Sequence, residues 1–389
     1  MEKPIKLLTE KDYKDIFELS QFAFQYKLSQ EQLAEKEAEA KRHKIWGWIE
    51  NNRLAAKVHM IPLEVHINDQ VMKMGGIASV SSWPEYRRGG FVKKLLKHTL
   101  MDMRLEGYTI SYLHPFSVPF YRKYGYELAF NYREYNIAVK HFQKDWDPIG
   151  KVKRIHTDHN LLDNIYTDYI NKFNGAIMRD DDWWKQRVIK KETVMAAGYG
   201  ENGSPDSYIL YHVKERVLYV EEIAYRTLNG LKLLLEFIRN HDSMVEKVNI
   251  KVPDEDFLPY LFDEPRFEQE VKQYFMARIV NVAEFLNNYQ FRKTDSSESI
   301  TLIVEDDFIP ENKGEYSIQL NGRSSAVNNG KTNKENVITC SVQQLTQMLL
   351  SFKRPLELEQ LALIKGSHKA IEHFDAMIPT KQTYFPDFF

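Results

Sequence analysis

The segment from Val71 to Met103 constrains the fold of this chain most, because a glycine turn joins two different hydrophobic periodicities. The stretch Val71–Ser82 is rich in apolar residues and predicts a strand. The next apolar residues recur with helical spacing: Phe91, Val92, Leu95, Leu96, Leu100 and Met103. The connecting run Tyr86-Arg87-Arg88-Gly89-Gly90 therefore lies between a strand and an amphipathic helix, which is typical of an α/β unit.

This turn is a candidate phosphate site. Backbone N–H groups at the start of a helix lack intrahelical partners and lie at the positive end of the helix dipole. Glycines let that backbone approach an anion closely, and Arg87 and Arg88 add positive charge, so the turn suits a pyrophosphate. The alternative is a tight strand-to-helix turn with solvated arginines. The run has neither the G-x-G-x-x-G pattern of a dinucleotide-binding fold nor the G-K-[ST] of a P-loop.

Length and composition narrow the class of protein. A chain of 389 residues implies two to four domains, at roughly 100–200 residues each. A hydrophobic fraction of 43% excludes a wholly disordered chain, and a formal net charge of −2 gives no basic footprint for nucleic acid. No segment offers the ~18 consecutive apolar residues of a membrane span.

The expected location is the cytoplasm. The single cysteine, Cys340, excludes an intramolecular disulfide, which suits a reducing compartment. The first residues, Met1–Lys6, lack the apolar core of a secretory signal.

Three domains are expected, covering residues 1–150, 151–279 and 280–389. The second repeats the order of the first faintly, as strand (Val217–Ala224), glycine (Gly230), apolar helix and strand (Val248–Val252), which indicates a suspected internal duplication. The third has alternating strand patterns and a helix that Ser341 can cap, so it is predicted to be a small α+β domain.

Two motifs carry a resemblance to a known family. Arg87-Arg88-Gly89-Gly90-Phe91-Val92 resembles the R-x-x-G-x-G/A acetyl-CoA loop of the GCN5-related N-acetyltransferases (GNAT), although Val92 stands where Gly or Ala is commonest. About 30 residues on, Phe120-Tyr121-Arg122-Lys123-Tyr124-Gly125-Tyr126 resembles the Y-x-x-x-G-[YF] element that closes the same fold. The whole chain is similar to the Eis (enhanced intracellular survival) family. The resemblance implies α/β and α+β folds: tandem GNAT (acyl-CoA N-acyltransferase) folds, the second degenerate, followed by a sterol-carrier-protein-like domain.

The resemblance also implies the site residues. The pantetheine and the thioester carbonyl would be held by the backbone of the preceding strand, and the pyrophosphate by the turn. The implied cofactor-binding residues are Val80, Ser81, Ser82, Arg88, Gly89, Gly90, Phe91, Val92, Lys93, Tyr121 and Arg122. Tyr126 matches the family's general acid, and the terminal carboxylate, here on Phe389, matches its general base. The implied activity is acetyl transfer from acetyl-CoA to primary amines, aminoglycosides or lysine side chains, in a ternary complex of a homo-oligomer, often a hexamer.

The chemistry of acyl transfer fits these residue types. The attacking amine must lose a proton, which a carboxylate can accept, and the tetrahedral oxyanion needs preorganised N–H donors. The leaving thiolate gains a proton, and a tyrosine with a pKa of about 10 stays protonated at neutral pH and can supply it. Proximity of the substrates is the remaining need, and no metal is required.

The alternatives remain open at this stage. Tyr126 could be a core tyrosine and Phe389 a frayed end. The chain could instead be a non-catalytic acyl-CoA or lipid binding protein that uses the sterol-carrier-like domain. Retention of the loop and tyrosine element in the first copy, but not in the second, favours chemistry in the first.

Other motifs have structural readings. Asp180-Asp181-Asp182-Trp183-Trp184 suggests a metal or carbohydrate site, but a capped helix with packed tryptophans is the preferred interpretation. Cys340 is expected in the core, and the twelve histidines lack H-x-x-x-H spacing, so no zinc site is predicted. The aromatic run from Phe22 to Tyr26 could line an acceptor pocket or pack in the core.

Overall fold

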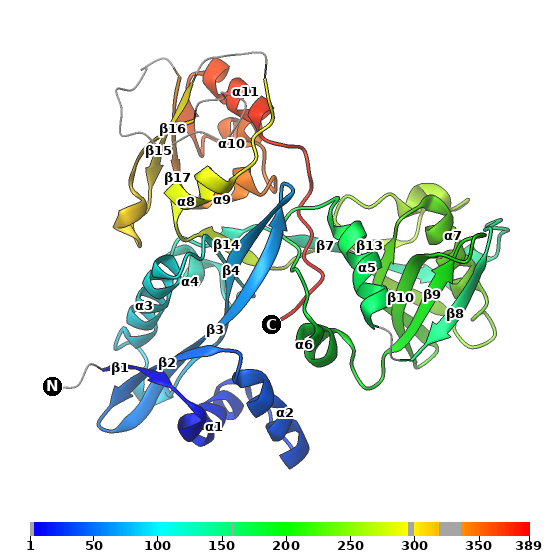
Figure 1. Ribbon diagram of the computed structural model, residues 1–389, viewed down its shortest axis with the longest axis horizontal. Coiled ribbons are helices and arrows are strands. Elements are labelled where there is room, and N and C mark those ends of the chain that lie inside the picture. The colour runs from blue at the N-terminus through cyan, green and yellow to red at the C-terminus, as the bar shows by residue number, and fades with distance from the viewer. Residues whose placement is uncertain (1–3, 157–158, 295–298, 319–335) are drawn as a thin grey trace. The chain divides into compact units, whose positions relative to one another are not determined.

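The computed structural model describes residues 4–156, 159–294, 299–318 and 336–389 (Figure 1). The chain forms two compact units, each with its own sheet and core. Unit 1 consists of residues 1–129, 275–380 and Phe389, and unit 2 of residues 130–274 and 381–388. No helix in the described ranges combines the length and apolarity that a bilayer crossing requires.

Unit 1 contains a seven-stranded sheet. Its order is β1 (Ile5–Leu8), β2 (Lys44–Glu50), β3 (Arg53–Ile67), β4 (Gln70–Ser82), β5 (Ile110–Leu113), β14 (Met276–Ile279) and β6 (Glu127–Leu128). The long antiparallel hairpin β3–β4 is its centre, and β4 and β5 are parallel, joined by the crossover helix α3 (Phe91–Leu105). The middle parts of β3 and β4 are buried on both faces because helices cover both.

The two faces have separate cores. On one face, α3 packs Leu95, Leu96, Leu100 and Met103 against alternate residues of β3 and β4. On the other, α1 (Tyr13–Phe24) buries Ile16, Phe17 and Leu19, and α2 (Gln30–Ala40) follows it. The short helix α4 (Val118–Arg122) leads into the turn before β6.

Unit 1 also contains a four-stranded sheet from the last third of the chain. Its order is β16 (Gly314–Ile318), β15 (Ile300–Glu305), β17 (Val337–Ser341) and β18 (Lys365–Gly366). The accompanying helices are α8 (Val282–Asn288), α9 (Val342–Leu349), α10 (Pro355–Gln360) and α11 (His368–Met377). Ser341 caps α9 as predicted, because its hydroxyl accepts a hydrogen bond from the Gln344 N–H.

Unit 2 repeats the architecture of the first sheet. Its strand order is β13 (Glu268–Gln273), β7 (Asn131–Ala138), β12 (Lys247–Val252), β11 (Val217–Tyr225), β10 (Pro205–Lys214), β9 (Val194–Tyr199) and β8 (Lys151–Ile155). The helices include α5 (His159–Ile170), α6 (Asp181–Trp183) and α7 (Leu228–Arg239). The parallel pair β11–β12, joined by α7, corresponds to the pair β4–β5 joined by α3, as the suspected duplication predicts.

Each seven-stranded sheet contains one strand from the part of the sequence that supplies most of the other sheet. Strand β7 lies before residue 150 but pairs with β12 and β13 in the second sheet. Strand β14 lies near the end of the second expected segment but pairs with β5 and β6 in the first sheet. The sheets therefore do not follow the contiguous divisions at 150 and 279, because strand pairing is decided by edge complementarity and not by distance along the chain.

Candidate functional site

The start of α3 is an open anion site. Gly90 is its N-cap, with a left-handed φ of 76°, and Arg88 before it has a φ of 67°. No side chain caps the helix, no acidic residue lies in its first turn, and a Cβ placed on Gly90 would meet nothing within 4 Å. The residues Arg87–Gly90 and Lys93 are exposed. The first N–H groups of α3 are therefore left for an external acceptor, beside exposed cationic side chains.

Phe91 and Val92 anchor this helix start to the core. Both are half-buried against the cluster under α3, and the ring of Phe91 stacks on Trp48 with centroids 4.7 Å apart. Lys94 lies over the other part of the same ring system, 4.8 Å from a Trp48 centroid. The turn is thus presented by a fixed helix, which favours a preorganised ligand site.

The corresponding start of α7 in unit 2 is closed. Thr227 is the N-cap and accepts a hydrogen bond from the Gly230 N–H at 3.1 Å. The carboxylate of Asp206 accepts a hydrogen bond from the Thr227 hydroxyl, and a Cβ on Gly230 would lie 2.8 Å from the Asp206 Oδ2. A side-chain anion therefore already occupies the positive end of α7, and it would repel a phosphate.

A bulge separates the end of β4 from its neighbours. Lys57 pairs with Ser81 and His59 pairs with Ala78, so β4 carries one extra residue in this interval, and Ser79 takes a φ of 50°. The pairing of β4 with β5 ends at Ile77. Its partner there, Leu113, is the last residue of β5, so Val80, Ser81 and Ser82 continue past the end of β5 and have no partner in that strand.

The tyrosine element brings Tyr121, Arg122 and Tyr126 together around α4. Tyr121 is buried, and its burial raises the pKa of the phenol. Its ring meets that of Tyr126 edge to face, with centroids 6.1 Å apart. Arg122 forms a two-pronged ion pair with Glu127, with N–O distances of 2.8 Å for both prongs, so its guanidinium is largely committed within the element.

Tyr126 is fully buried and hydrogen-bonded to Ser111, with 2.8 Å between the two hydroxyl oxygens. Ser111 donates its own proton to the carbonyl of Gly75 at 2.7 Å, so Tyr126 is the donor in the first bond. Burial raises the pKa of Tyr126 to about 12, although the Ser111 hydrogen bond and the charge of Arg278 oppose this. The phenol is therefore protonated at neutral pH, as a proton donor must be.

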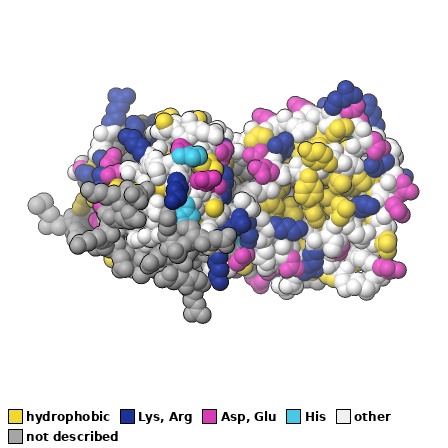
Figure 2. Space-filling model, turned by 90° about the horizontal axis from the view of Figure 1, so that it is seen from above, with side chains coloured by type: hydrophobic (Ala, Val, Ile, Leu, Met, Phe, Trp, Pro, Cys, Tyr) yellow, Lys and Arg dark blue, Asp and Glu magenta, His cyan; other side chains and the backbone are white. Residues whose placement is uncertain are grey.

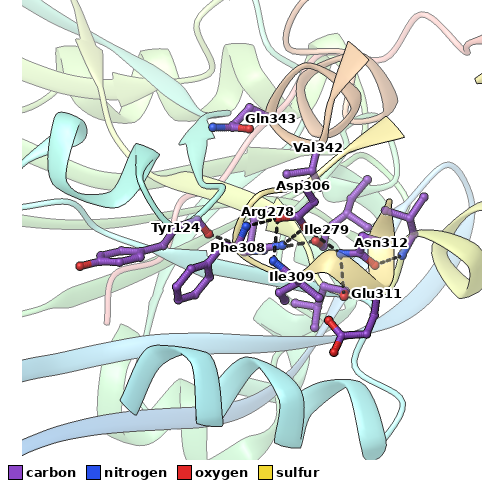
Figure 3. A network of polar contacts seen from close by, with 12 residues as sticks. Tyr124, Arg278, Ile279, Asp306, Phe308, Ile309, Glu311, Asn312, Val342 and Gln343 are labelled. Atoms are coloured by element: carbon purple, nitrogen blue, oxygen red, sulfur yellow. Dashed lines mark hydrogen bonds and ion pairs between the residues drawn. The ribbon is translucent and has the colours of Figure 1, made fainter. Parts of the chain in front are cut away.

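A buried ion pair holds the turn before Tyr126 (Figure 3). Gly125 has a φ of 79°, and a Cβ there would lie 2.7 Å from Nη1 of Arg278 on β14. Arg278 donates to the carbonyl of Tyr124 and to Asp306 Oδ2, the latter at 2.5 Å. Asp306 also accepts hydrogen bonds from backbone N–H groups and from Asn312 Nδ2, so the pair is buried with its polar atoms satisfied.

Phe389 reaches the same stretch of β4. Its ring is buried, packs edge to face on Phe275 with centroids 5.0 Å apart, and lies 2.9 Å from where a Cβ on Gly76 would be. Tyr126 is linked through Ser111 to the neighbouring residue, Gly75. Phe389 is therefore packed, not frayed. It lies at the glycine that follows the one linked to Tyr126, and the two glycines face opposite sides of the sheet, since a Cβ on Gly75 would meet Met103 of α3.

The structural readings of the aspartate–tryptophan motif and of Cys340 hold, whereas that of the aromatic run does not. Asp180 caps α6 by accepting a hydrogen bond from the Trp183 N–H at 2.7 Å, and Trp183 and Trp184 are buried. Cys340 is buried on β17, where burial raises the pKa of its thiol to about 12. The aromatic run on α1 does not pack in the core, since Phe22, Phe24 and Tyr26 are 51%, 49% and 38% exposed.

Sequence reasoning missed four residues that support the site: Ser111, Ser79, Lys57 and Arg278. Ser111 and Arg278 could not be linked to Tyr126 from local patterns. Lys57 and His59 did leave a signal, because they interrupt the apolar strand Leu54–Ile67, and charged residues at buried strand positions are rare unless paired.

Family models match three parts of the chain. An acetyltransferase (GNAT) domain matches residues 4–129, a second acetyltransferase (GNAT) domain matches residues 175–279, and a sterol carrier protein domain matches residues 282–386. No curated protein matches the sequence.

Solved structures with the same fold match the whole length. A probable N-acyltransferase from Enterococcus faecalis V583 has 24% identity and a TM-score of 0.94, with 99% of each chain covered. A GCN5-related N-acetyltransferase from Anabaena variabilis has 20% identity and a TM-score of 0.88, again with 99% of each chain covered. Eis1 from Mycobacterium abscessus has 18% identity and a TM-score of 0.81, with 100% of each chain covered. The expected order of two GNAT folds and a sterol-carrier-like domain is confirmed.

Proposed function

Because the chain belongs to the GNAT acetyltransferases, with two such domains ahead of a sterol carrier protein domain, we propose that it transfers an acetyl group from acetyl-CoA to a primary amine of the aminoglycoside or lysine type. The observation that carries this proposal is the contrast between the open start of α3 and the start of α7, which Thr227 and Asp206 close.

Acetyl-CoA would bind unit 1. The pyrophosphate would accept hydrogen bonds from the backbone between Arg88 and Lys93, and the pantetheine would lie along Val80–Ser82. Support comes from the exposed glycine turn and from the extension of β4 past the end of β5 at Leu113. Tyr121 and Arg122 would border the cofactor. Among the described residues, no three acidic, imidazole or thiol groups gather as metal ligands would.

The reaction would be a direct attack in a ternary complex. The terminal carboxylate of Phe389 would attract the cationic amine and accept its proton, since such a carboxyl is ionised at neutral pH. The neutral amine would attack the thioester carbonyl, whose oxyanion β4 N–H groups would stabilise. Tyr126 would protonate the leaving thiolate, since its phenol is protonated at neutral pH. The half-exposed rings of Phe22 and Phe24 would suit an acceptor surface.

The protein would act as a homo-oligomer, by family resemblance a hexamer. Figure 2 shows hydrophobic side chains gathered on one face of unit 2. Among the described residues of unit 2, the exposed apolar side chains include Phe257, Tyr260 and Val271, which are 53%, 90% and 47% exposed. Large apolar patches on a surface are typical of association sites.

Calorimetric titration with CoA tests the cofactor site. Lys93→Glu places a negative charge in the first turn of α3 and should weaken binding about tenfold, since charges near a helix terminus are worth ~0.3–1 kcal/mol each and ~1.4 kcal/mol is a factor of ten. Lys232→Glu makes the same charge change near the start of α7 and should leave the affinity unchanged.

Weaker CoA binding in Lys232→Glu but not in Lys93→Glu, or no binding of CoA to the wild type, would refute the assignment. An assay with acetyl-CoA and an aminoglycoside or a lysine peptide tests the activity. Binding of CoA without turnover on any amine would favour the alternative of a non-catalytic acyl-CoA binding protein.

A further inference from the structure

Strand β3 buries a lysine without an acidic partner. The side chain of Lys57 is completely buried, and none of the carboxylates in the described part of the chain forms an ion pair with it. Its Nζ instead lies 3.0 Å from the carbonyl oxygen of Ser79, 2.7 Å from the Ser79 hydroxyl and 3.1 Å from Nε2 of His59. The Lys57 side chain thus contacts the bulge of β4 at Ser79.

A series of polar groups continues from Lys57 toward the surface, and its last step, from His43 to Glu39, is wider than a hydrogen bond. Nδ1 of His59 lies 3.3 Å from Nδ1 of His43, and Nε2 of His43 lies 3.8 Å from Oε1 of Glu39. The other oxygen of Glu39 is paired at 2.8 Å with Lys36, whose side chain is 45% exposed. At the inner end, the hydroxyls of Ser79 and Ser20 lie 3.3 Å apart.

The groups from Ser79 to His43 can hydrogen-bond to one another in either proton arrangement. As an ammonium, Lys57 donates to the two Ser79 oxygens and to Nε2 of His59, whose Nδ1–H then points to His43. As a neutral amine, Lys57 can accept the hydroxyl proton of Ser79. Each atom in the series can therefore take a proton on one side and release one on the other.

Burial also gives Lys57, His59 and His43 pKa values that suit proton transfer. It lowers the pKa of Lys57 to about 7, and it lowers the pKa of His43 to about 4 with help from the charges of Lys36, Arg42 and Lys57. The pKa of His59 is lowered well below its usual range by burial and by Lys57. Neutral rings pass a proton without retaining it. The other titratable groups around the series are Glu39 on α2 and Tyr26. Tyr26 follows α1 and interacts with Ser20 of that helix.

The series lies on the same sheet face as Phe389. Alternate residues of a strand share a face, so Lys57, His59 and Ile61 point to one side of β3. Ile61 pairs with Gly76, against which the Phe389 ring packs, and Ser79 follows Gly76 by three residues on β4. Ser79 is partly exposed and directly precedes Val80–Ser82.

Acetylation of an ammonium releases one proton. One N–H bond of the ammonium breaks first and gives the free amine. After the amine attacks, its nitrogen loses a second proton. This proton replaces the one that Tyr126 gives to the thiolate. The first proton must leave the site, and a carboxylate base must lose it again before the next turnover.

We propose that Ser79, Lys57, His59 and His43 form the path along which this proton leaves the acetyl-transfer site of unit 1. The inference rests on the proposed acetyltransferase function. The O–H bond of the protonated Phe389 carboxyl breaks as this proton bonds to the Ser79 oxygen, and the Ser79 proton passes to the amine of Lys57. Lys57 then passes a proton to His59, and His43 delivers one beside Glu39 to solvent. Ser79 directly precedes the strand residues assigned to the site, Val80–Ser82, and the other three are positioning residues that act through it.

Lys57→Met tests the path, with kcat measured from pH 5.5 to 9 on acetyl-CoA with an aminoglycoside and with a lysine peptide. Wild-type kcat should rise with pH through about 7, because Lys57 accepts a proton only when neutral. Proton-transfer assistance is typically worth ~10²–10⁴-fold, so Lys57→Met should lose about 100-fold at pH 7 together with that rise. Its affinity for CoA should be unchanged.

His43→Gln separates a proton path from a purely structural lysine. His43 touches neither Ser79 nor Lys57 in the network, so a role of Lys57 in holding the bulge predicts normal kcat for His43→Gln. The path predicts a lower kcat over the same pH range, and this variant carries the test if Lys57→Met fails to fold. Lys44→Met is the matched control and should behave as wild type. Lys44 lies on β2 and is paired with Asp102 and Glu106.

The outcomes distinguish the two proposals. An unchanged pH profile in Lys57→Met, or normal kcat in His43→Gln, overturns the path and leaves the acetyltransferase assignment intact. A wild-type protein that binds CoA but acetylates no amine overturns both. Loss of the pH-dependent rise in both variants, with CoA affinity retained, supports the path.

Discussion

At the scale of single residues, the hydroxyl of Tyr126 is the group whose removal is most informative. Tyr126→Phe keeps the buried ring and removes only the bond to Ser111. We expect kcat to fall by ~10²–10⁴-fold, because the leaving thiolate loses its proton donor, while the Kd of CoA stays near wild type. Steady-state kinetics and calorimetry measure the two quantities.

Tyr124→Phe is the matched control, two residues away in the same element. It removes a hydroxyl of the same kind and should leave kcat near wild type. A kcat of Tyr126→Phe equal to that of Tyr124→Phe would make Tyr126 a packing residue.

The carboxylate of Phe389 can be altered without disturbing its ring. Extending the chain beyond Phe389 converts the carboxylate into a neutral amide and keeps the packing on Phe275 and Gly76. A misplaced or lost catalytic group can cost ~10²-fold, so kcat should fall by about that factor with little change in Tm. The same tag at the N-terminus is the control. Full activity of the C-terminally extended protein would exclude the carboxylate as base.

At the scale of elements, the turn before Tyr126 depends on Arg278 of β14. Arg278→Met leaves Asp306 buried without its cation, and removing one partner of such a pair typically costs ~3–5 kcal/mol. We expect a loss of that size in the free energy of unfolding, measured by urea denaturation, with a lower kcat because Tyr124 and Gly125 lose their anchor. The double variant Arg278→Met with Asp306→Asn should be less destabilised than the single one, and equal losses would argue against the ion pair.

Elements are also the level at which the sequence was most informative. The strand Ile5–Leu8 and the cap at Ser341 were predicted as found, because periodicity and capping are local properties. The partners of the strands were not, since nothing near Met276–Ile279 indicates that it pairs between β5 and β6. For the candidate site, the turn and the tyrosine element were predicted from motifs, whereas Ser111 and Lys57 required the register of β3, β4 and β5.

At the scale of the whole molecule, the strand exchange predicts that the first 150 residues do not form a stable domain. A chain ending at residue 150 would lack β14, so β5 would expose an unpaired edge and β6 would lose its partner in the sheet. Exposed apolar strand edges promote aggregation. We expect aggregates in size-exclusion chromatography with light scattering, and a folded monomer would contradict this expectation. The full-length chain is the control.

The place of β14 in the first sheet also bears on how the protein emerges from the ribosome. Strand β5 is synthesised about 160 residues before the strand that covers its edge, an interval of roughly 8–32 s at ~5–20 residues per second. During this time the nascent sheet has an open edge, and holdase chaperones would find their binding sites there. Translation speed between codons 114 and 276 should therefore influence the yield of soluble protein, even for synonymous changes that leave the finished molecule identical.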